Sequence, residues 1–175
     1  MNTSHVESAS RLCTACGMCC NGVLFQSVTL QPDDSPRELK ARGIRLKSKR
    51  GKTFFDQPCP AHRNCACTIY ADRPSRCRIF ECQQLRDLEA GRTTESDAQK
   101  IIAQAKELTE RVRSLLPAAG STNDRRPLAT RFAAALVQNN DPETDPAGSQ
   151  LRGELITAMH RLESLLAASF RVAKV

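Results

Sequence analysis

The chain has 175 residues and a formal net charge of +7, with six Phe, one Tyr and no Trp. This length fits one domain, or one domain with a helical extension, and so few aromatic side chains exclude a core built mainly on aromatic packing. No apolar run approaches the roughly 20 residues that a membrane helix needs, and the N-terminal sequence lacks the apolar segment of a secretory signal. We therefore expect a cytoplasmic protein with no membrane contact.

The first half of the sequence predicts short elements. Residues 1–12 are polar and predict a mobile tail, and apolar residues within 23–30 predict a short strand. Residues 34–43 predict a helix, because an Asp or Ser precedes Pro36 at the first helical position and a Gly ends the segment. Residues 44–55 alternate around a Gly and predict a hairpin.

The turn of this hairpin carries a basic run, Lys47, Lys49, Arg50 and Lys52. Such a run is usually a solvated turn, and a phosphate-binding tip is the alternative. No aromatic residue stands within the run to stack on bases, so we do not expect a nucleic acid as partner.

The second half of the sequence predicts helices. Apolar residues recur there at steps of three and four, which is typical of amphipathic helices that form a core or contact a protein partner. His160 falls on the last helix with no second His or carboxylate at ligand spacing, and we interpret it as an ordinary residue. The predicted stripes are Ile101, Ala105, Leu108, Val112 and Leu115; Leu128, Phe132 and Leu136; and Leu151, Leu155, Met159, Leu162, Leu166 and Phe170.

All nine cysteines lie in the first half, in two clusters that span Cys13–Cys20 and Cys59–Cys82. An odd number of thiols in a reducing compartment argues against a disulfide framework. Clustered cysteines there more often bind metal, and redox-active dithiols are the alternative. Metal binding also offers the folding free energy that a thin apolar core lacks, on the order of 10 kcal/mol or more for thiolate-bound zinc.

The spacing of the thiols leaves zinc and iron both open. A Cys-x2-Cys pair directs two sulfurs toward one point, as in tetrahedral zinc sites and in iron–sulfur clusters. Cys13, Cys16 and Cys19 have the spacing that begins the bacterial ferredoxin run, and Cys59 precedes a Pro as the last Cys of that run does, although it stands forty residues further along. Ligand pairs joined across a hairpin are instead the zinc-ribbon arrangement.

The adjacent pair Cys19 and Cys20 adds a constraint, because neighbouring side chains diverge and rarely bind one ion together. Eight thiols therefore suit either two four-thiolate sites or one centre with several metals. The ninth is then spare, and we assign that place to Cys65, because Cys67 continues into the segment "TIY".

Other residues near the second cluster are candidates for a supporting role. Arg73, Arg76 and Arg78 surround Cys77, and guanidinium groups can donate to thiolate sulfur and offset its charge. Surface ion pairs are the alternative for these arginines. His62 is a further candidate ligand, which eight available thiols make unnecessary.

The segments "CTACGMCC", "CP", "CTIYADRPSRCR" and "FEC" occur in this order within residues 11–84. They resemble the YkgJ-type cysteine-cluster family, whose members are described as zinc- or iron-chelating. The resemblance implies a metal role for eight cysteines and leaves Cys65 outside the pattern. Those eight are Cys13, Cys16, Cys19, Cys20, Cys59, Cys67, Cys77 and Cys82.

The sequence thus predicts an α+β protein, in which residues 11–90 form a small, irregular, metal-nucleated module with short strands and residues 95–175 form a helical extension. We expect it to bind zinc or iron through clustered thiolates and to contact a protein partner through its C-terminal helices. It has no catalytic motif beyond the cysteines, which favours a protein that is not an enzyme. An iron–sulfur enzyme component or electron carrier is the alternative, and a nucleic-acid-binding zinc protein is a weaker one.

Overall fold

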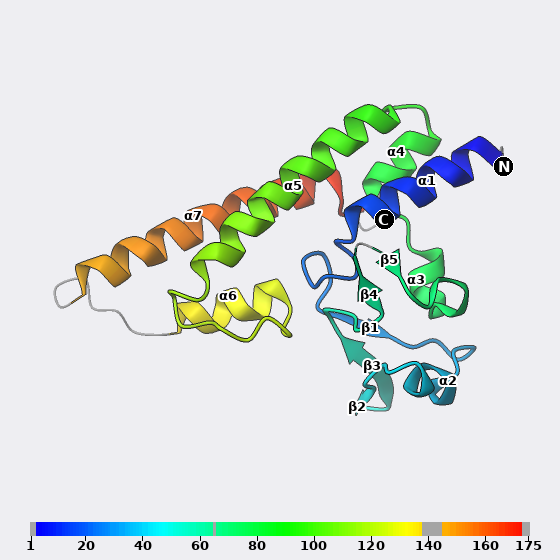
Figure 1. The fold of residues 1–175 in the computed structure, drawn as a ribbon, viewed down its shortest axis with the longest axis horizontal. Coiled ribbons are helices and arrows are strands. Elements are labelled where there is room, and N and C mark those ends of the chain that lie inside the picture. Colours follow the sequence, from blue (N-terminus) through cyan, green and yellow to red (C-terminus); the bar gives the residue numbers. More distant parts are fainter. Residues whose placement is uncertain (1–2, 65, 138–144, 173–175) are drawn as a thin grey trace. The chain divides into compact units, whose positions relative to one another are not determined.

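The computed structural model describes residues 3–64, 66–137 and 145–172, and it confirms an α+β fold of helices and short antiparallel strands (Figure 1). The chain divides into two compact units. Unit 1 comprises Met1–Glu81 with Arg125–Pro127, and unit 2 comprises Cys82–Asp124 with Leu128–Val175. Within the ranges described, no helix is both long enough and apolar enough to cross a membrane.

Unit 1 holds the short elements and most of the cysteines. Its helices and strands are α1 (Thr3–Cys16), β1 (Ser27–Thr29), α2 (Pro36–Ala41), β2 (Lys47–Lys49), β3 (Lys52–Asp56), β4 (His62–Arg63), β5 (Ala66–Cys67), the 3-10 helix η1 (Tyr70–Asp72) and α3 (Ser75–Ile79).

The predicted hairpin is confirmed as β2 and β3, which pair antiparallel with Ser48 opposite Thr53. Strand β1 pairs with the other edge of β3, with Val28 opposite Phe55, so that the sheet has the order β1-β3-β2. Strands β4 and β5 form a separate two-stranded ribbon. The predicted helix at 34–43 is also confirmed, and Ser35 is its N-cap, since its side chain accepts from the Glu38 amide.

The core of unit 1 is small, and partly buried thiols border it. Cys59, Cys67 and Cys77 pack against its buried residues. This placement ties the thiols to the apolar packing of the unit. The buried residues of this cluster are Val28, Leu39, Ile44, Phe55, Ala61 and Ile69, and Leu12, Met18 and Val23 are also buried in unit 1.

The prediction of a mobile tail over residues 1–12 is wrong, because helix α1 spans Thr3–Cys16. The segment contains neither Gly nor Pro, and Leu12, only 1% exposed, anchors the helix to the unit. The helix ends at Gly17, whose φ of +68° breaks the helical geometry. The Cys13–Cys16 pair therefore lies on the last turn of a helix, three residues apart on one face.

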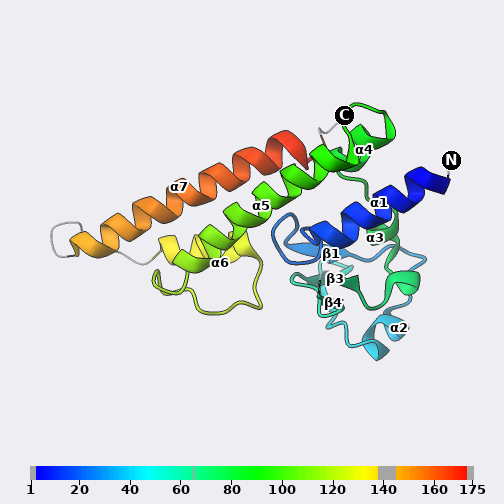
Figure 2. The same cartoon turned by 45° about the horizontal axis from the view of Figure 1, so that its top comes forward.

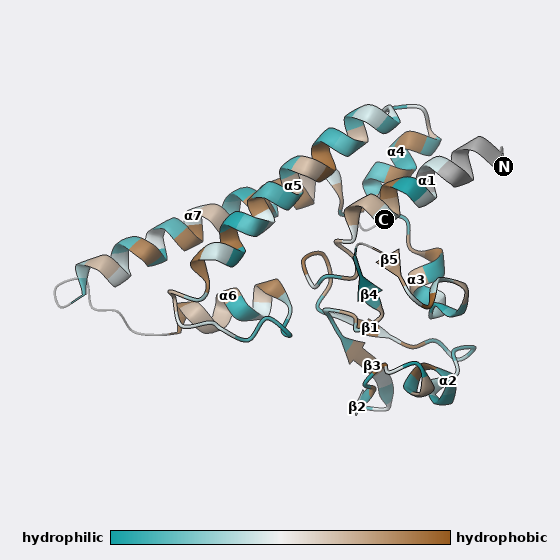
Figure 3. Cartoon of the chain, in the orientation of Figure 1, coloured by the Kyte–Doolittle hydropathy of each residue, from teal (hydrophilic) through white to brown (hydrophobic). Residues whose placement is uncertain are grey.

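Unit 2 is helical. Its long helices α5 and α7 run side by side in both views of the chain (Figures 1 and 2), and hydrophilic and hydrophobic segments alternate along each of them (Figure 3). Its elements are α4 (Gln83–Glu89), α5 (Glu95–Leu115), α6 (Leu128–Leu136) and α7 (Pro146–Ser169).

Helix α4 groups with unit 2, although the sequence placed it inside the cysteine module. The backbone N–H of Gln83 donates to the carbonyl of Phe170 at 3.1 Å, and Gln84 Nε2 donates to the carbonyl of Ser169 at 3.0 Å. These contacts join α4 to the end of α7, a connection across more than eighty residues that local sequence patterns do not contain.

The predicted stripe of α7 is confirmed, since Leu155, Met159, Leu162 and Leu166 are buried. The stripe predicted for α5 is shifted, because Ile102 and Thr109 are buried while Ile101 and Leu108 are only partly so. On α6 Leu128 is buried as predicted and Phe132 and Leu136 are only partly buried, while Arg131 and Ala135 complete the buried face. On α5 the buried face is displaced by one residue from the predicted stripe at two positions, to Ile102 and Thr109. On α6 the buried face includes Arg131, a charged residue that an apolar pattern does not predict.

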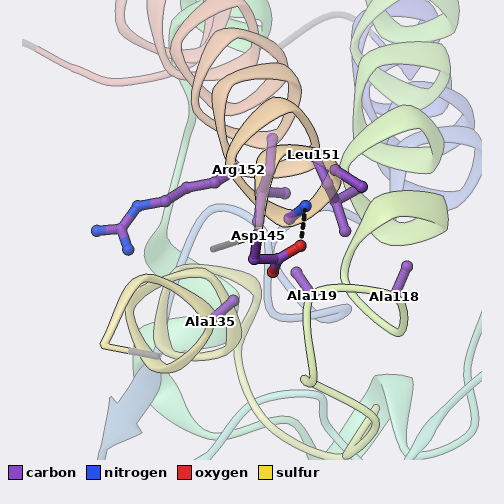
Figure 4. Close-up of a pocket in the computed structure, with 9 residues that line it drawn as sticks. Ala118, Ala119, Ala135, Asp145, Leu151 and Arg152 are labelled. Carbon is purple, nitrogen blue, oxygen red and sulfur yellow. Dashed lines mark hydrogen bonds between the residues drawn. The ribbon is translucent and has the colours of Figure 1, made fainter. Parts of the chain in front are cut away.

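Unit 2 also contains a pocket of about 380 Å³ between the end of α5, helix α6 and the start of α7. Figure 4 shows small side chains around it, with the guanidinium of Arg152 directed away from the alanines. Asp145 is the N-cap of α7 and accepts from the Gly148 amide at 2.9 Å. The pocket is lined by Ala118, Ala119, Ala135, Asp145, Ala147, Gly148, Leu151, Arg152 and Leu155.

Candidate metal centre

The cysteines named from the sequence stand on several elements. Cys13 and Cys16 lie on the last turn of α1, and Cys19 and Cys20 lie in the turn that follows. Cys59 follows β3, Cys67 ends β5 and Cys77 lies in α3. All are present as thiols, with Cys13 exposed and the others partly buried. Cys65 lies outside the described residues.

Cys82, the eighth candidate, is the first residue of unit 2 and the N-cap of α4. It is also a partly buried thiol. Burial raises the pKa of Cys82, and the nearby backbone N–H groups of Leu85 and Gln84 oppose that rise.

Backbone hydrogen bonds bring the two cysteine clusters together within unit 1. The N–H of Cys59 donates to the carbonyl of Cys20 at 2.8 Å, which joins the turn after α1 to the segment after β3. The N–H of His62 donates to the carbonyl of Cys59 at 3.0 Å. In the β4–β5 ribbon, His62 stands opposite Cys67. Cys20, Cys59 and Cys67 are therefore held in one region by main-chain contacts.

Burial and neighbouring thiols raise the pKa of two of these cysteines well above its ordinary value. Burial raises the pKa of Cys20 to about 12, and Cys59, Cys77, Cys67 and Cys13 contribute to the rise in that order. Burial, followed by Cys59 and Cys67, likewise raises the pKa of Cys77 to about 11. Thiolates crowded in this way repel one another, and a bound cation is the physical means of stabilising them together.

The cysteine sulfurs of the two clusters are suitable ligands for a thiolate-bound metal. Sulfur ligands suit zinc and iron–sulfur centres, whereas calcium and magnesium require oxygen. Among the residues that the structure describes, no three His, Cys, Asp or Glu side chains converge closely enough to hold one ion. Ligation by three or four of these thiols therefore requires their side chains to turn toward the ion.

The three arginines around Cys77 differ in their surroundings. Arg73 stacks on the ring of Tyr70, 3.5 Å from its centroid, and its Nε donates to the Tyr70 carbonyl at 2.9 Å. Its positive charge lowers the pKa of Cys77, against the larger effect of burial. Arg78 donates to Ser75 Oγ at 3.1 Å, and Arg76 is exposed. Arg73 is therefore the arginine whose charge acts on a thiol.

His62 lies against the first cysteine cluster. A Cβ added at Gly17 would stand 2.6 Å from His62 Nε2, so the imidazole occupies the space beside this glycine. His62, a further candidate ligand from the sequence, belongs to β4 of the β4–β5 ribbon, and its imidazole lies against Gly17. The other residues considered from the sequence are peripheral, since His160 is exposed and Lys47 forms an ion pair with Asp56 across the hairpin.

Sequence reasoning missed the acidic pair before α2. Asp34 Oδ1 accepts from the backbone N–H of Ser75 at 2.7 Å, and Asp33 Oδ2 accepts from Ser75 Oγ at 2.6 Å. These bonds join the loop before α2 to the start of α3, two residues before Cys77. In the sequence, Asp33 and Asp34 stand next to the N-cap Ser35, and local patterns relate such acidic residues to the start of α2 rather than to α3.

The fold and the thiols define an α+β module in which two cysteine clusters come together as a candidate metal centre. A family model described as "CxxCxxCC: Putative zinc- or iron-chelating domain" matches residues 12–112, more than half of the chain. The chain belongs to this family, which confirms the family predicted from the cysteine motifs. No curated protein and no solved structure matches the chain.

Proposed function

We propose that this protein binds zinc or iron through the clustered thiolates of its cysteine module and that it acts without catalysis of its own. The observation that carries the proposal is geometric: the Cys59 N–H donates to the Cys20 carbonyl at 2.8 Å, and Cys59, Cys67 and Cys77 pack against one hydrophobic cluster, in a chain of a zinc- or iron-chelating family. The proposed ligands are Cys13, Cys16, Cys19, Cys20, Cys59, Cys67, Cys77 and Cys82.

The metal, Arg73 and the backbone hydrogen bonds of Cys59 would each contribute to the proposed centre. Once bound, the metal would keep the thiols deprotonated and draw the segments of the module together. Arg73 offsets part of the thiolate charge beside Cys77, and backbone bonds fix Cys59 against the Cys20 turn.

An iron–sulfur electron carrier or enzyme component is the second candidate. The spacing of Cys13, Cys16 and Cys19 favours it, because the same spacing begins the bacterial ferredoxin run. Elemental analysis of protein purified without air separates the candidates. Zinc protein is colourless, whereas an iron–sulfur protein is brown, with broad absorbance near roughly 400 nm. Protein that holds neither metal, and that takes up neither on reconstitution, would contradict both.

A cytoplasmic location and a protein partner on the C-terminal helices also remain proposals. The apolar stripes of α5 and α7 are buried, so a partner would meet other side chains of these helices. Ile156 on α7, 43% exposed, is one such side chain. Cross-linking in cells followed by identification of the peptides joined to α7 would test the partner. Fractionation of the same cells would test the location.

A further inference from the structure

Helix α3, which carries Cys77, begins without a cap from its own sequence. Its N-cap residue is Pro74, which has no side-chain acceptor, and no local side chain caps the helix. The first N–H groups of any helix need partners from outside the helix. The N–H of Ser75, the first residue of α3, finds its partner 41 residues away in Asp34.

Both carboxylate oxygens of Asp34 are held. Oδ1 accepts from the Ser75 N–H at 2.7 Å and lies 3.0 Å from Ser75 Oγ, whose single proton it shares with Asp33 Oδ2 at 2.6 Å. Oδ2 accepts from the backbone N–H of Gln31 at 2.7 Å. Asp34 is thus fixed to its own loop by one oxygen and to α3 by the other.

The contact lies two residues before Cys77. Ser75 is buried, at 7% exposure, and Cys77 follows it by two residues in a helix of only five. The N–H of Cys77 already donates to the Pro74 carbonyl at 2.8 Å, so the turn from Pro74 to Cys77 is a closed unit. A short helix has little stability of its own, and its position depends on such a tether and on its packing beside β1.

We infer that Asp34 is a positioning residue of the metal centre: its carboxylate caps α3 from a distant loop and fixes the backbone at Cys77, from which the thiol turns toward the metal. This inference rests on the proposed metal-binding function. Asp34 itself does not ligate the metal in this assignment, since its two oxygens are engaged with backbone N–H groups.

The test compares Asp34→Asn with Asp33→Asn in the full chain. An Asn at 34 keeps one acceptor but presents an NH₂ group in place of the second, so it cannot accept from both Gln31 and Ser75. Asp33 is the matched control, because it is the adjacent residue, it loses the same charge, and its side chain is 66% exposed. Its contacts are with the Ser75 hydroxyl at 2.6 Å and with Arg78 at 3.8 Å, and they leave the Ser75 N–H with Asp34.

Three measurements report on the variants. Competition with a chelator gives zinc affinity, which we expect Asp34→Asn to lower by about 10- to 100-fold, the usual range for a residue that orients a ligand. The sulfur-to-metal charge-transfer absorbance of cobalt-loaded protein reports the number of bound thiolates, and it should fall in Asp34→Asn at limiting cobalt. Hydrogen exchange of the Ser75 and Cys77 amides, in the protein as purified, should become faster.

Each result decides the inference. The inference is supported if Asp33→Asn matches the parent in all three measurements while Asp34→Asn binds zinc more weakly, shows less charge-transfer absorbance and exchanges its amides faster. Equal zinc affinity and equal charge-transfer absorbance in the two variants overturn it, because Asp34 would then be a structural residue at most. Should the parent bind neither zinc nor iron, the proposed function and the positioning role fail together, and amide exchange still decides whether Asp34 caps α3.

Discussion

The imidazole of His62 lies directly beside Gly17, at the point where helix α1 ends and the turn with Cys19 and Cys20 begins. A Cβ at position 17 would stand 2.6 Å from His62 Nε2, closer than real carbon atoms approach. Gly17 also has a φ of +68°, a conformation that costs other residues roughly 1–2 kcal/mol. The glycine of "CTACG" therefore lets the two cysteine clusters approach through His62.

Gly17→Ala is expected to destabilise unit 1 more than Gly43→Ala does. Both glycines follow a helix at positive φ, but a Cβ at Gly43 would meet nothing within 4 Å. The backbone strain is thus shared, and only Gly17→Ala adds the overlap with His62, worth about 1–3 kcal/mol. Urea denaturation of both variants measures the difference. Equal losses of stability would show that His62 moves aside freely.

Metal removal is expected to unfold unit 1 and leave unit 2 largely helical. The buried core of unit 1 is small, and thiolate–metal bonds can contribute on the order of 10 kcal/mol of folding free energy. Helices α5 and α7 pack on each other through buried residues such as Leu162 and Leu166, with no cysteine between them. Limited proteolysis with and without a strong chelator is the measurement. Cleavage of unit 1 at the same rate in both samples would contradict the prediction.

Cys67→Ser is expected to lower the metal content per chain, and Cys65→Ser to leave it close to the parent. Cys67 packs against the core of unit 1 and contributes to the raised pKa of Cys20 and of Cys77. Cys65 lies outside the family pattern. Elemental analysis of both purified variants tests the assignment, which is wrong if the two lose metal equally.

Arg73→Lys is expected to weaken metal affinity by roughly 10-fold or more while the amount of metal bound at saturation stays the same. Lysine keeps the charge, but it loses the planar group that stacks on Tyr70 and the Nε that donates to the Tyr70 carbonyl. The control is Arg76→Lys, because Arg76 is an exposed arginine of the neighbouring helix α3. Chelator competition gives both affinities. If they match, Arg73 is a surface charge with no effect on Cys77.

Arg131→Met is expected to leave the stability of unit 2 within about 1 kcal/mol of the parent or to raise it. Arg131 is 7% exposed, its Nε has no hydrogen-bond partner among the described residues, and its Nη2 donates to the Ser121 carbonyl at 3.2 Å. Methionine fills a similar length without a buried charge, whereas Arg131→Ala leaves a void and should cost about 2 kcal/mol or more. Thermal unfolding of both variants is the measurement. A large loss in Arg131→Met would mean that the guanidinium is essential to the loop before α6.

The sequence alone determined the features that depend on residue type and local order. Cysteine spacing identified the family and the candidate ligands, because a metal site needs donors of one chemistry at short separations. Turn and cap residues identified the β2–β3 hairpin and the Ser35-capped α2, and apolar periodicity identified α5 and α7. Each of these signals depends on residues that are close together in the sequence, so it can be recognised without knowledge of the tertiary structure.

Only the tertiary structure decided the features that depend on contacts between distant residues. Helix α1 is anchored by the burial of Leu12, although its segment is polar enough to read as a tail. The cap of α3 comes from Asp34, 41 residues away, and Arg73 rather than Arg76 or Arg78 acts on Cys77. A side chain's partner across such a separation is fixed by how the backbone packs, and no local pattern carries that information.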